Sequence, residues 1–453
     1  MRRKGKNKME LPLPTALKHF AEALEREGVS LYAVGGCVRD ALLNRPVHDV
    51  DLASKLLPEA LMNRATACGV EARIVQETLG TVLLTFDGRT FEHTTFRTES
   101  YGAGGTHRPD AVRFAASAKK DAFRRDFSVN ALYQNVLTGE ILDPTGGLAD
   151  LDRRVLRTTT DDPEIILRDD GLRILRLVRF AAMLGFSVEP KTWEAAKANA
   201  ALLQDVAWER KRQELDRILL GEHVLEGLTL LKEVGALPYV LPECAACDGV
   251  AQRSDHHKYD VLMHMFHTCA EANADLVSRL TGLLHDVGKP VTKARDGNLY
   301  AHDIDSAELA RKMLMRLRYP NALIDRVCFA IRAHMFDLAE TASDATIMRR
   351  FAQWGRTATE DVIAIREADI RGSGYKLTYR AERWRNLYEQ MQKQGAPFSE
   401  SELNITGADI MQELGIESGE RVGRIKRQLL LHCAVHPEDN TKSALKKRMH
   451  DYR

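Results

Sequence analysis

The strongest constraint on the fold is a change of pattern near residue 155. Before it, short apolar runs rich in β-branched and aromatic residues alternate with turns, as in LYAV at 31–34, TVLLTF at 81–86 and ALYQNV at 131–136. Runs of this length and composition are typical of strands. Beyond residue 155 strand signals nearly vanish and helical periodicity continues to the end. The pattern predicts an α/β head followed by several all-helical units.

The size and charge of the chain exclude several classes. A length of 453 residues corresponds to about three domains. Hydrophobic residues make up 44% and charged residues 28%, which excludes a collagen-like or largely disordered protein. Lys and Arg number 65 against 64 Asp and Glu, so no global field attracts nucleic acid. Any nucleic-acid binding must therefore come from local clusters.

The ends and the cysteines indicate a cytoplasmic protein. Residues 1–10 are basic and are predicted to form a disordered tail. They are not followed by the apolar segment of a signal peptide. No stretch approaches the roughly 18 apolar residues that cross a bilayer, so no membrane partner is expected. The seven cysteines are irregularly spaced, which favours a reducing compartment. Cys244 and Cys247 form a single CxxC without a second pair, which argues against a zinc ribbon.

A glycine turn near the N-terminus is a candidate phosphate site. VGGCVRDALL at 34–43 is a strand, a Gly-Gly turn and the start of a helix. Gly35 and Gly36 would let backbone N–H groups approach phosphate oxygens, and Arg39 would add charge-assisted hydrogen bonds to a triphosphate. Gly-Gly turns are common, so this motif is weak alone.

The residues that follow the glycine turn strengthen its interpretation as a phosphate site. Asp49 and Asp51 alternate on a strand and project from one sheet face. Two carboxylates so close repel unless a cation lies between them, and Mg²⁺ binds through one or two carboxylates plus substrate phosphates. Glu92, on the next plausible strand, is a third candidate ligand. Two metal ions there would activate an attacking hydroxyl and stabilise a leaving pyrophosphate. The alternative is a solvated strand face.

A second motif begins at residue 169. Asp170 and Arg173 are three residues apart and are expected to share a helix face. An aspartate accepts from the amino group of cytosine or adenine, and an arginine donates to the adjacent ring nitrogen or carbonyl. Together they would reject uracil and guanine. Arg176 and Arg179 extend the face and concentrate positive charge. The alternative is an ion pair on an amphipathic surface helix.

Four segments in order carry a family resemblance. GGCVRD (35–40), DVD (49–51), RRDFSVNAL (124–132) and DDGLRILRLVRFAA (169–182) resemble the class II tRNA nucleotidyltransferases, the CCA-adding enzymes, and their bacterial poly(A) polymerase relatives. The resemblance covers about residues 28–220. It implies a DNA-polymerase-β-like head with a mixed sheet, and a helical neck, body and tail.

The resemblance also implies roles for individual residues. Gly36 and Arg39 would bind nucleotide, Asp49 and Asp51 would bind Mg²⁺, and Asp170 with Arg173 would match the base-selecting pair. Nucleotide contacts are implied for Arg125, Arg176 and Arg179, while Asp126 and Asn130 would either position the ribose or hold their own loop. A glycine-rich segment at 97–110 matches a family loop that is needed for adding the last adenosine and is shortened in CC-adding enzymes. Its full length favours CCA or A addition.

The middle helical region contains an HD pattern. His264, the adjacent pair His285 and Asp286, and Asp369 match the HD-domain phosphohydrolases, in the contexts LLHDVGKP (283–290) and EADIRG (367–372). Adjacent His and Asp supply two ligands from one turn, and a distant His and Asp close the site, so a divalent transition metal is a candidate cofactor. Further histidines that could add ligands or phosphate contacts stand at 256, 257, 302 and 334. The alternative is a degenerate HD fold that only supports tRNA.

Together, these patterns predict how the chain is divided into domains and which reaction it catalyses. The expected parts are a basic tail (1–10), a nucleotidyltransferase head (11–155), a helical neck with the base-selecting helix (156–245), an HD domain (246–375) and a helical tail (376–453). The tail segment 403–430 resembles the family's C-terminal element, and its basic residues would contact tRNA phosphates. We expect CCA addition to tRNA 3′ ends from CTP and ATP, with the acceptor and T arm recognised by shape. The alternatives are an A-adding enzyme, a poly(A) polymerase, an HD phosphohydrolase and a non-catalytic RNA-binding protein.

Overall fold

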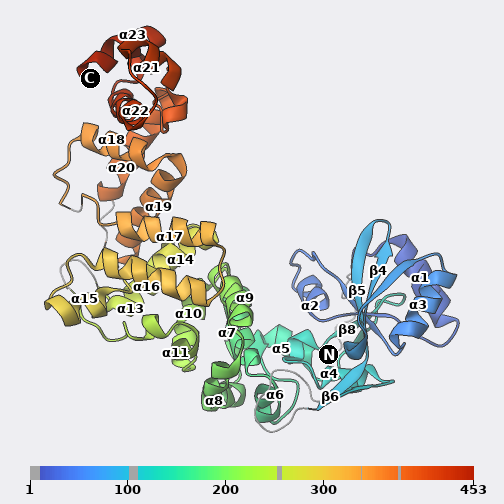
Figure 1. Cartoon of the computed structure of the whole chain (residues 1–453). Helices are drawn as coiled ribbons and strands as arrows, with labels where there is room; N and C mark the ends of the chain where they lie inside the picture. Colours follow the sequence, from blue (N-terminus) through green and yellow to red (C-terminus); the bar gives the residue numbers. More distant parts are fainter. Residues whose placement is uncertain (1–10, 101–110, 253–257, 338, 376–378, 453) are drawn as a thin grey trace. The chain divides into compact units, whose positions relative to one another are not determined.

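The computed structural model describes residues 11–100, 111–252, 258–337, 339–375 and 379–452, and these form two compact units, Met1–Val240 and Leu241–Arg453 (Figure 1). The expected parts at 1–10 and around 376–378 lie wholly or partly outside the described residues. The chain changes from mixed α/β to helical within the first unit, which confirms the predicted fold class.

The first unit contains a seven-stranded mixed sheet in the order β3-β4-β5-β2-β1-β8-β9. Its strands are β1 Tyr32–Val34, β2 Asp51–Ser54, β3 Glu71–Gln76, β4 Thr81–Phe86, β5 Arg89–Thr95, β8 Tyr133–Asn135 and β9 Ile141–Leu142. β2 pairs in parallel with β5, and the other neighbours are antiparallel. Asp87 and Gly88 join β4 to β5 with positive φ, as a type I′ hairpin turn requires.

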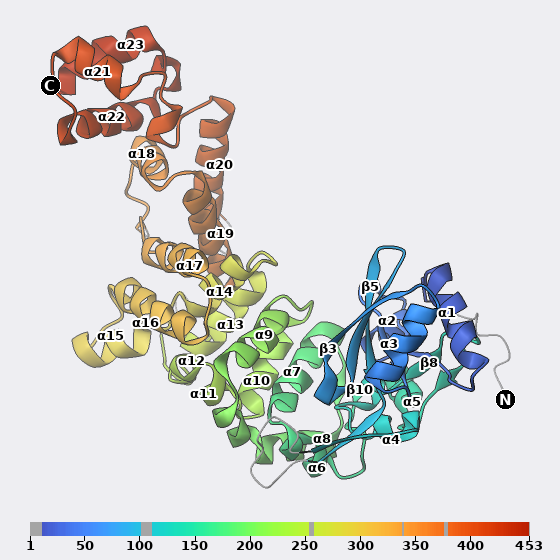
Figure 2. The ribbon, with the colours of Figure 1, turned by 45° about the vertical axis from the view of Figure 1, so that its right-hand side comes forward.

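Helices and short strands complete the head. Helix α1 (Thr15–Glu25) buries Leu17, Phe20 and Leu24, and the Phe20 ring lies 5.6 Å from that of Phe86 on β4. Figure 2 shows α1, α2 and α3 beside the sheet. The remaining elements here are α2 Gly36–Leu42, α3 Pro58–Ala67, β6 Arg97–Ser100, β7 Ala111–Phe114, α4 Ala118–Ala122 and α5 Gly147–Arg153.

The rest of the first unit is built around helix α7 (Leu172–Leu184). Nearly all of its residues are buried, and it packs against α9 and α10. It ends at Gly185, whose left-handed φ of 64° is the conformation that glycine adopts at the C-terminal end of a helix. The other elements are β10 Val155–Leu156, α6 Pro163–Asp169, β11 Ser187–Val188, α8 Pro190–Ala198, α9 Trp208–Leu219, α10 Val224–Glu233 and α11 Leu237–Val240.

The described part of the second unit is entirely helical. Its helices are α12 Pro242–Ala245, α13 Val261–Glu271, α14 Leu276–Leu284, α15 Lys289–Asp296, α16 His302–Arg316, α17 Asn321–Ala333, α18 Asp344–Trp354, α19 Arg356–Gly372, α20 Tyr379–Lys393, α21 Gly407–Leu414, α22 Glu420–Cys433 and α23 Lys442–Arg448. A Cβ on Gly372 would lie 2.6 Å from the backbone nitrogen of Thr268, so this glycine permits the close approach of α19 to α13. Phe351, Trp384 and Ile425 belong to one core that joins α18–α22.

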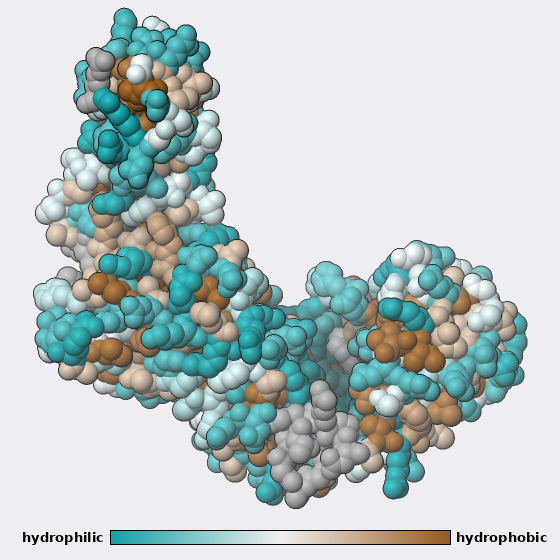
Figure 3. Space-filling model, in the orientation of Figure 1, coloured by the Kyte–Doolittle hydropathy of each residue, from teal (hydrophilic) through white to brown (hydrophobic). Residues whose placement is uncertain are grey.

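The surface agrees with a helical unit that packs its apolar residues inward. In Figure 3, hydrophilic residues predominate over the visible face of the second unit, and apolar residues appear in separate groups. Among the described residues, no helix combines the length and the apolar character needed to cross a membrane.

Candidate active site and metal centre

A cavity of about 780 Å³ lies within the first unit and brings together segments from residue 35 to residue 217. Its lining includes nine arginines: Arg39, Arg97, Arg124, Arg125, Arg173, Arg176, Arg179, Arg210 and Arg217. It also includes six carboxylates: Asp40, Asp49, Asp51, Glu99, Asp126 and Asp170. All head residues predicted from sequence line this cavity except Glu92. Its excess of positive charge suits a polyanionic ligand.

The sheet register brings the predicted carboxylates together. β1 pairs with β2 so that Val34 stands opposite Asp51, and β2 pairs with β5 so that Leu52 stands opposite His93. Asp51 and Glu92 each precede that second pair by one residue and are both exposed. The glycine turn, which follows Val34, therefore starts beside Asp51.

The electrostatics of this edge favour a cation. Loss of hydration beneath the surrounding chain raises the pKa of Asp51, the charge of Glu92 raises this pKa further, Arg125 opposes the rise, and Asp49 adds to it. A bound divalent ion would offset the repulsion that Glu92 and Asp49 exert on the Asp51 carboxylate. Oxygen-only donors that keep solvent access match the ligand preference of Mg²⁺. These residues fit the metal that the polymerase-β-like head implies.

The glycine turn is held in a conformation that only glycine adopts easily. Gly35 has φ 84° and ψ −132°, and α2 begins at Gly36. Arg39 on this helix is 4% exposed and donates from Nε and Nη2 to the Asp40 carboxylate at 2.8 and 2.9 Å. Its Nη1 donates to Asn130 Oδ1 at 2.6 Å. The guanidinium is therefore fixed against the cavity wall.

That contact is the first link of a buried polar chain. Asn130 donates to Asp126 Oδ1 at 3.2 Å, and Arg176 Nε donates to Asp126 Oδ2 at 2.7 Å. Burial alone would raise the pKa of Asp126, but the charge of Arg176 outweighs it and lowers the pKa to about 2. Asp126 and Asn130 thus connect the arginine of α2 to an arginine of α7, and both also line the cavity.

Helix α7 begins two residues later than the proposed base-selecting pair requires. The expectation that Asp170 and Arg173 share a helix face is wrong: the helix starts at Leu172, and Asp170 precedes it with extended backbone. Asp170 accepts the Leu172 N–H at 3.0 Å and Arg210 Nη2 at 2.9 Å. Arg173 donates to the carbonyls of Ile166 and Arg124 at 2.8 and 2.9 Å. Both side chains nevertheless line the same cavity.

Three arginines surround one aromatic ring beside this pair. The guanidinium carbons of Arg39, Arg176 and Arg179 lie 5.0, 5.5 and 4.1 Å from the centroid of Phe180. Burial lowers the pKa of Arg179 to about 10, the charge of Arg176 lowers it as well, and Glu214 opposes both effects. An anion bound here would offset the mutual repulsion of these guanidinium groups.

Asp121 is an organising residue that sequence reasoning missed. It is 1% exposed and accepts from Arg124 Nε at 2.7 Å, Arg125 Nε at 3.2 Å and the Tyr133 hydroxyl at 2.6 Å. Burial acts to raise its pKa, but Arg125 and Arg124 lower the pKa to about 2. The sequence signal that could have indicated these contacts is the spacing of Asp121 to Arg124 and Arg125, three and four residues further on.

The loop prediction at 97–110 falls mostly outside the described residues. Its flanks are described: β6 and β7 pair antiparallel, with Ser100 opposite Ala111. On β6, Glu99 accepts from Arg97 Nε at 2.7 Å and from Arg124 Nη1 at 3.1 Å. The segment that enters the loop is thus tied to the same arginine that Asp121 holds.

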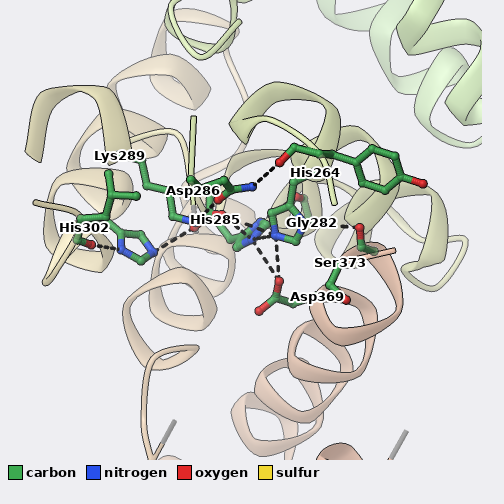
Figure 4. Close-up of polar contacts among 12 residues, drawn as sticks. His264, Gly282, His285, Asp286, Lys289, His302, Asp369 and Ser373 are labelled. Carbon is green, nitrogen blue, oxygen red and sulfur yellow. Dashed lines mark hydrogen bonds and ion pairs between the residues drawn. The ribbon is translucent and has the colours of Figure 1, made fainter. Parts of the chain in front are cut away.

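The four predicted HD residues converge in the second unit (Figure 4). His264 lies on α13, His285 and Asp286 follow α14, and Asp369 lies on α19. His264 Nε2 is 3.2 Å from His285 Nε2, 2.9 Å from Asp369 Oδ1 and 3.5 Å from Asp286 Oδ2. Ring nitrogens and carboxylates that face one another at these distances form a donor set for a divalent transition metal.

The charge balance of this cluster also favours a cation. Burial would lower the pKa of His285, but Asp286 and Asp369 raise it to about 10, so the carboxylates hold positive charge in the pocket. Lys289 Nζ donates to Asp286 Oδ2 at 2.5 Å and to Gln252 Oε1 at 2.7 Å. The donor set fits a bound metal.

The additional histidines divide into two groups. His256 and His257 lie outside the described residues. His302 and His334 are buried, and together with Asp286 they form a second group whose donor atoms lie within 4.8 Å of one another. His302 Nε2 is 2.9 Å from Asp286 Oδ1.

Known sequence families match both units. The "Poly A polymerase head domain" matches residues 31–157, and the "Probable RNA and SrmB- binding site of polymerase A" matches 185–247. The "HD domain" matches 221–371, and domain 2 of tRNA nucleotidyltransferase matches 299–448.

Individual proteins extend the likeness to the whole chain. A CCA-adding enzyme of Geobacillus sp. (strain WCH70) is 30% identical over 445 residues, 98% of this chain and 97% of that protein. An A-adding tRNA nucleotidyltransferase of Deinococcus radiodurans is 35% identical over 342 residues, 71% and 76% of the two chains. The crystal structure of the Bacillus stearothermophilus CCA-adding enzyme in complex with CTP is 25% identical, with a TM-score of 0.68, and covers 97% of this chain and 98% of that one.

Other alignments are shorter at higher identity. A CCA-adding enzyme of Lactiplantibacillus plantarum is 43% identical over 217 residues, and the matched region spans about half the length of each chain, 47% here and 51% there. Similarity over nearly the whole length defines the class: the chain belongs to the family of class II CCA-adding enzymes and poly(A) polymerases, and it carries an HD domain.

Proposed function

We propose that this protein is a template-independent nucleotidyltransferase that adds CCA to the 3′ end of tRNA from CTP and ATP. The observation that carries the proposal is the juxtaposition of Asp49, Asp51 and Glu92 with a glycine turn and an arginine-lined cavity in one unit. Carboxylates at the mouth of a cationic cavity serve a reaction that moves negative charge between phosphates.

In the proposed reaction the tRNA 3′-hydroxyl oxygen attacks the α-phosphorus of the nucleoside triphosphate in line. A bond forms between that oxygen and the α-phosphorus, the bond to the β-phosphate bridging oxygen breaks, the hydroxyl proton is released, and pyrophosphate leaves. Asp49 and Asp51, with Glu92 beside them, would hold Mg²⁺, which when bound neutralises charge on the attacking and leaving oxygens.

The arginines of the cavity supply the remaining charge stabilisation. Arg39 and Arg125 are held by Asp40 and Asp121, so neither side chain needs to be ordered when the triphosphate arrives. Preorganised donors of this kind stabilise developing charge without reorganisation. Arg176 and Arg179 provide positive charge deeper in the cavity, around Phe180.

Base selection is assigned to Asp170 and Arg173. A carboxylate that accepts from an amino group and a guanidinium that donates to the neighbouring ring atom match cytosine and adenine, and mismatch uracil and guanine. Arg210 Nη2 donates to Asp170 Oδ2 and orients this carboxylate at the cavity wall.

The partner of this reaction would be the tRNA acceptor and T arm, recognised through shape and backbone. Basic residues of α22 and α23 are candidates for phosphate contacts, which predicts that affinity falls as salt rises. A-adding enzymes and poly(A) polymerases share the chemistry of the head, and the Deinococcus radiodurans relative is A-adding.

The test separates these products. Pure protein is incubated with Mg²⁺, CTP, ATP and tRNA transcripts that end either before CCA or after CC, and the 3′ ends are sequenced. CCA addition that then stops supports the proposal. Growth from the CC end alone indicates an A-adding enzyme, a long adenosine tract indicates a poly(A) polymerase, and no extension of either transcript contradicts nucleotidyl transfer.

A second function is favoured by the donor set of His264, His285, Asp286 and Asp369. We propose that this cluster binds a divalent transition metal and that the unit hydrolyses phosphate esters. Hydrolysis of a chromogenic phosphate ester with Ni²⁺, Co²⁺ or Mn²⁺ tests it. Absence of both metal binding and hydrolysis would leave the HD helices with a structural role.

A further inference from the structure

Phe180 on α7 lies at the centre of the arginine cluster in the head cavity. It lines this cavity but is only 5% exposed. The guanidinium carbons of Arg39, Arg176 and Arg179 lie 5.0, 5.5 and 4.1 Å from the centroid of its ring. At such distances the negative face of an aromatic ring attracts a cation. One ring therefore contacts guanidinium groups from two helices, α2 and α7.

Two of these arginines are also fixed by carboxylates. Arg39 donates to Asp40, and Arg176 donates to Asp126. These hydrogen bonds set the direction of each side chain separately, whereas the ring is common to both. Because like charges repel strongly where water is largely excluded, a common partner of opposite polarity helps to keep the guanidinium groups together.

Arg179 depends on the ring more than the other two arginines do. It is 4% exposed, and its Nε lies 3.1 Å from Glu214 Oε2. Both of these atoms are nevertheless buried without a hydrogen-bond partner, so this contact is an ion pair and not a directed hydrogen bond. The Phe180 ring, with its centroid at 4.1 Å, supplies a second contact that fixes the position of this guanidinium.

Two other roles for the ring agree less well with its surroundings. A platform for stacking a base needs an open ring face, and a ring that is 5% exposed beside three guanidinium groups offers little free surface. A residue that only fills the core would resemble Phe127, which is 0% exposed and is not among the described residues that line the cavity. The two rings pack edge to face, with centroids 5.8 Å apart. Phe127 is therefore a matched comparison for a role in packing alone.

We propose that Phe180 is a positioning residue for nucleotidyl transfer, and that its ring face holds the three guanidinium groups together to receive the triphosphate. This role rests on the proposed function, because it takes the cavity as the site of the nucleoside triphosphate. It adds that the electron density of one ring, and not only the charge of the arginines, determines the affinity for the phosphates.

The test changes the electron density of the ring at nearly constant shape. Full-length protein is made with Phe180 replaced by phenylalanine analogues that carry one, two or three fluorine atoms, which draw electron density from the ring face. The dissociation constant of CTP with Mg²⁺, without tRNA, is measured by isothermal titration calorimetry. We expect it to rise with each added fluorine, by about 10-fold across the series, which is the size of a cation–π contribution at a desolvated site.

Matched proteins separate the possible failures. The same analogues at Phe127 should leave the dissociation constant within about twofold. Phe180→Leu removes the ring face and should weaken CTP binding at least as much as three fluorine atoms do. If Phe180→Leu does not fold, the fluorine series alone decides the question.

Two results would overturn the positioning role while nucleotidyl transfer stands, because the unmodified protein would still bind CTP and extend tRNA. One is a dissociation constant that does not vary along the fluorine series at Phe180. The other is an equal rise from the analogues at Phe127, which would assign the effect to packing. Failure of the unmodified protein to bind CTP would overturn the proposed function as well.

Discussion

The head cavity and the HD centre both bring carboxylates together, but different groups surround the carboxylates and offset their mutual repulsion in the two sites. At the head, Asp49, Asp51 and Glu92 are exposed, and Asp49 and Asp51 line a cavity that also contains nine arginines. In the HD centre Asp286 and four histidines are buried among helices. Oxygen donors with solvent access suit a hard ion that arrives with its substrate, whereas buried nitrogen and oxygen donors suit a resident transition metal.

The same contrast appears in what fixes each site. The head depends on hydrogen bonds of arginines to residues distant in the sequence, such as Arg39 with Asn130 and Arg176 with Asp126. His285, His302 and His334 of the HD centre instead receive their direction from carbonyls three residues away. The head should therefore be sensitive to single charge changes, and the HD centre to the way its helices pack.

The largest effect is expected from Asp51→Asn. Loss of this proposed Mg²⁺ ligand should lower nucleotide addition by about 10³-fold or more, because a metal ion stabilises transition-state charge by several kcal/mol. Metal bound at the HD centre should not change. Asp87→Asn, at the tip of the β4–β5 hairpin, is the matched carboxylate-to-amide control and should stay within about twofold of wild type. Addition by Asp51→Asn near the wild-type rate would contradict the assignment.

The converse change is His285→Ala with Asp286→Ala. It removes two of the four predicted donors and should abolish metal-dependent hydrolysis. Nucleotide addition should remain within about twofold, measured on the same preparations. Loss of both activities would mean that the HD helices act structurally.

A stability effect of about 3–5 kcal/mol is expected from Asp121→Asn, because Arg124 and Arg125 would lose a buried counter-ion. Urea unfolding measures it. The folded pKa of Asp121, about 2, is below its ordinary value of 3.8, so its contribution is present above pH 4 and is lost as the pH falls through 2. The wild-type advantage over the variant should therefore shrink below pH 4. An advantage that does not vary with pH would contradict the role of this charge.

A smaller effect is expected from Arg173→Ala. Discrimination against UTP should weaken by about 10- to 100-fold, the range that a two-point base contact of 1–3 kcal/mol supplies. The measurement is kcat/KM for CTP and UTP with the same tRNA. Because Arg173 also donates to two backbone carbonyls, unfolding is followed in parallel. Unchanged rejection of UTP by a folded variant would refute the base-selecting role.

The smallest effect comes from the glycine turn. Gly35→Ala places a Cβ in a left-handed conformation and should cost about 1–3 kcal/mol of unfolding free energy. Gly36→Ala is the matched control, since its Cβ would meet only Arg39 Nη2 at 3.6 Å and it lies in a helix that alanine favours. Equal cost for the two substitutions would remove the argument from backbone strain.

In the head, the sequence predicted the positions of some site residues, and it misplaced or missed others. A period of two predicted that Asp49 and Asp51 lie on one strand face, but β2 begins at Asp51 and Asp49 precedes it, so only Asp51 lies on the predicted strand. The parallel pairing of β2 with β5 explains why Glu92 lies near Asp51. Asp170 was misplaced because the extended backbone at this residue delays the helix until Leu172, a choice that three-residue spacing does not reveal. Asp121 was missed because helix α4 has only five residues and gives no periodic signal.

The HD centre shows a different limit. The adjacent His285 and Asp286 were recognisable in the sequence. The second group of donor atoms comes from Asp286, His302 and His334, which follow or begin three different helices. Only the packing of those helices determines whether the residues meet. The roles of the site residues and the expected domain boundaries remain predictions.

The parallel pairing of β2 with β5 has a consequence for how the head assembles during folding. The β4–β5 hairpin closes through the two-residue turn at Asp87 and Gly88, so its contacts are local and form early. β2 reaches β5 only after α3, β3 and β4 have intervened, and the closure of such a long loop is slow. The three carboxylates of the head therefore meet late, and a chain interrupted before β5 is made contains two of them without the third.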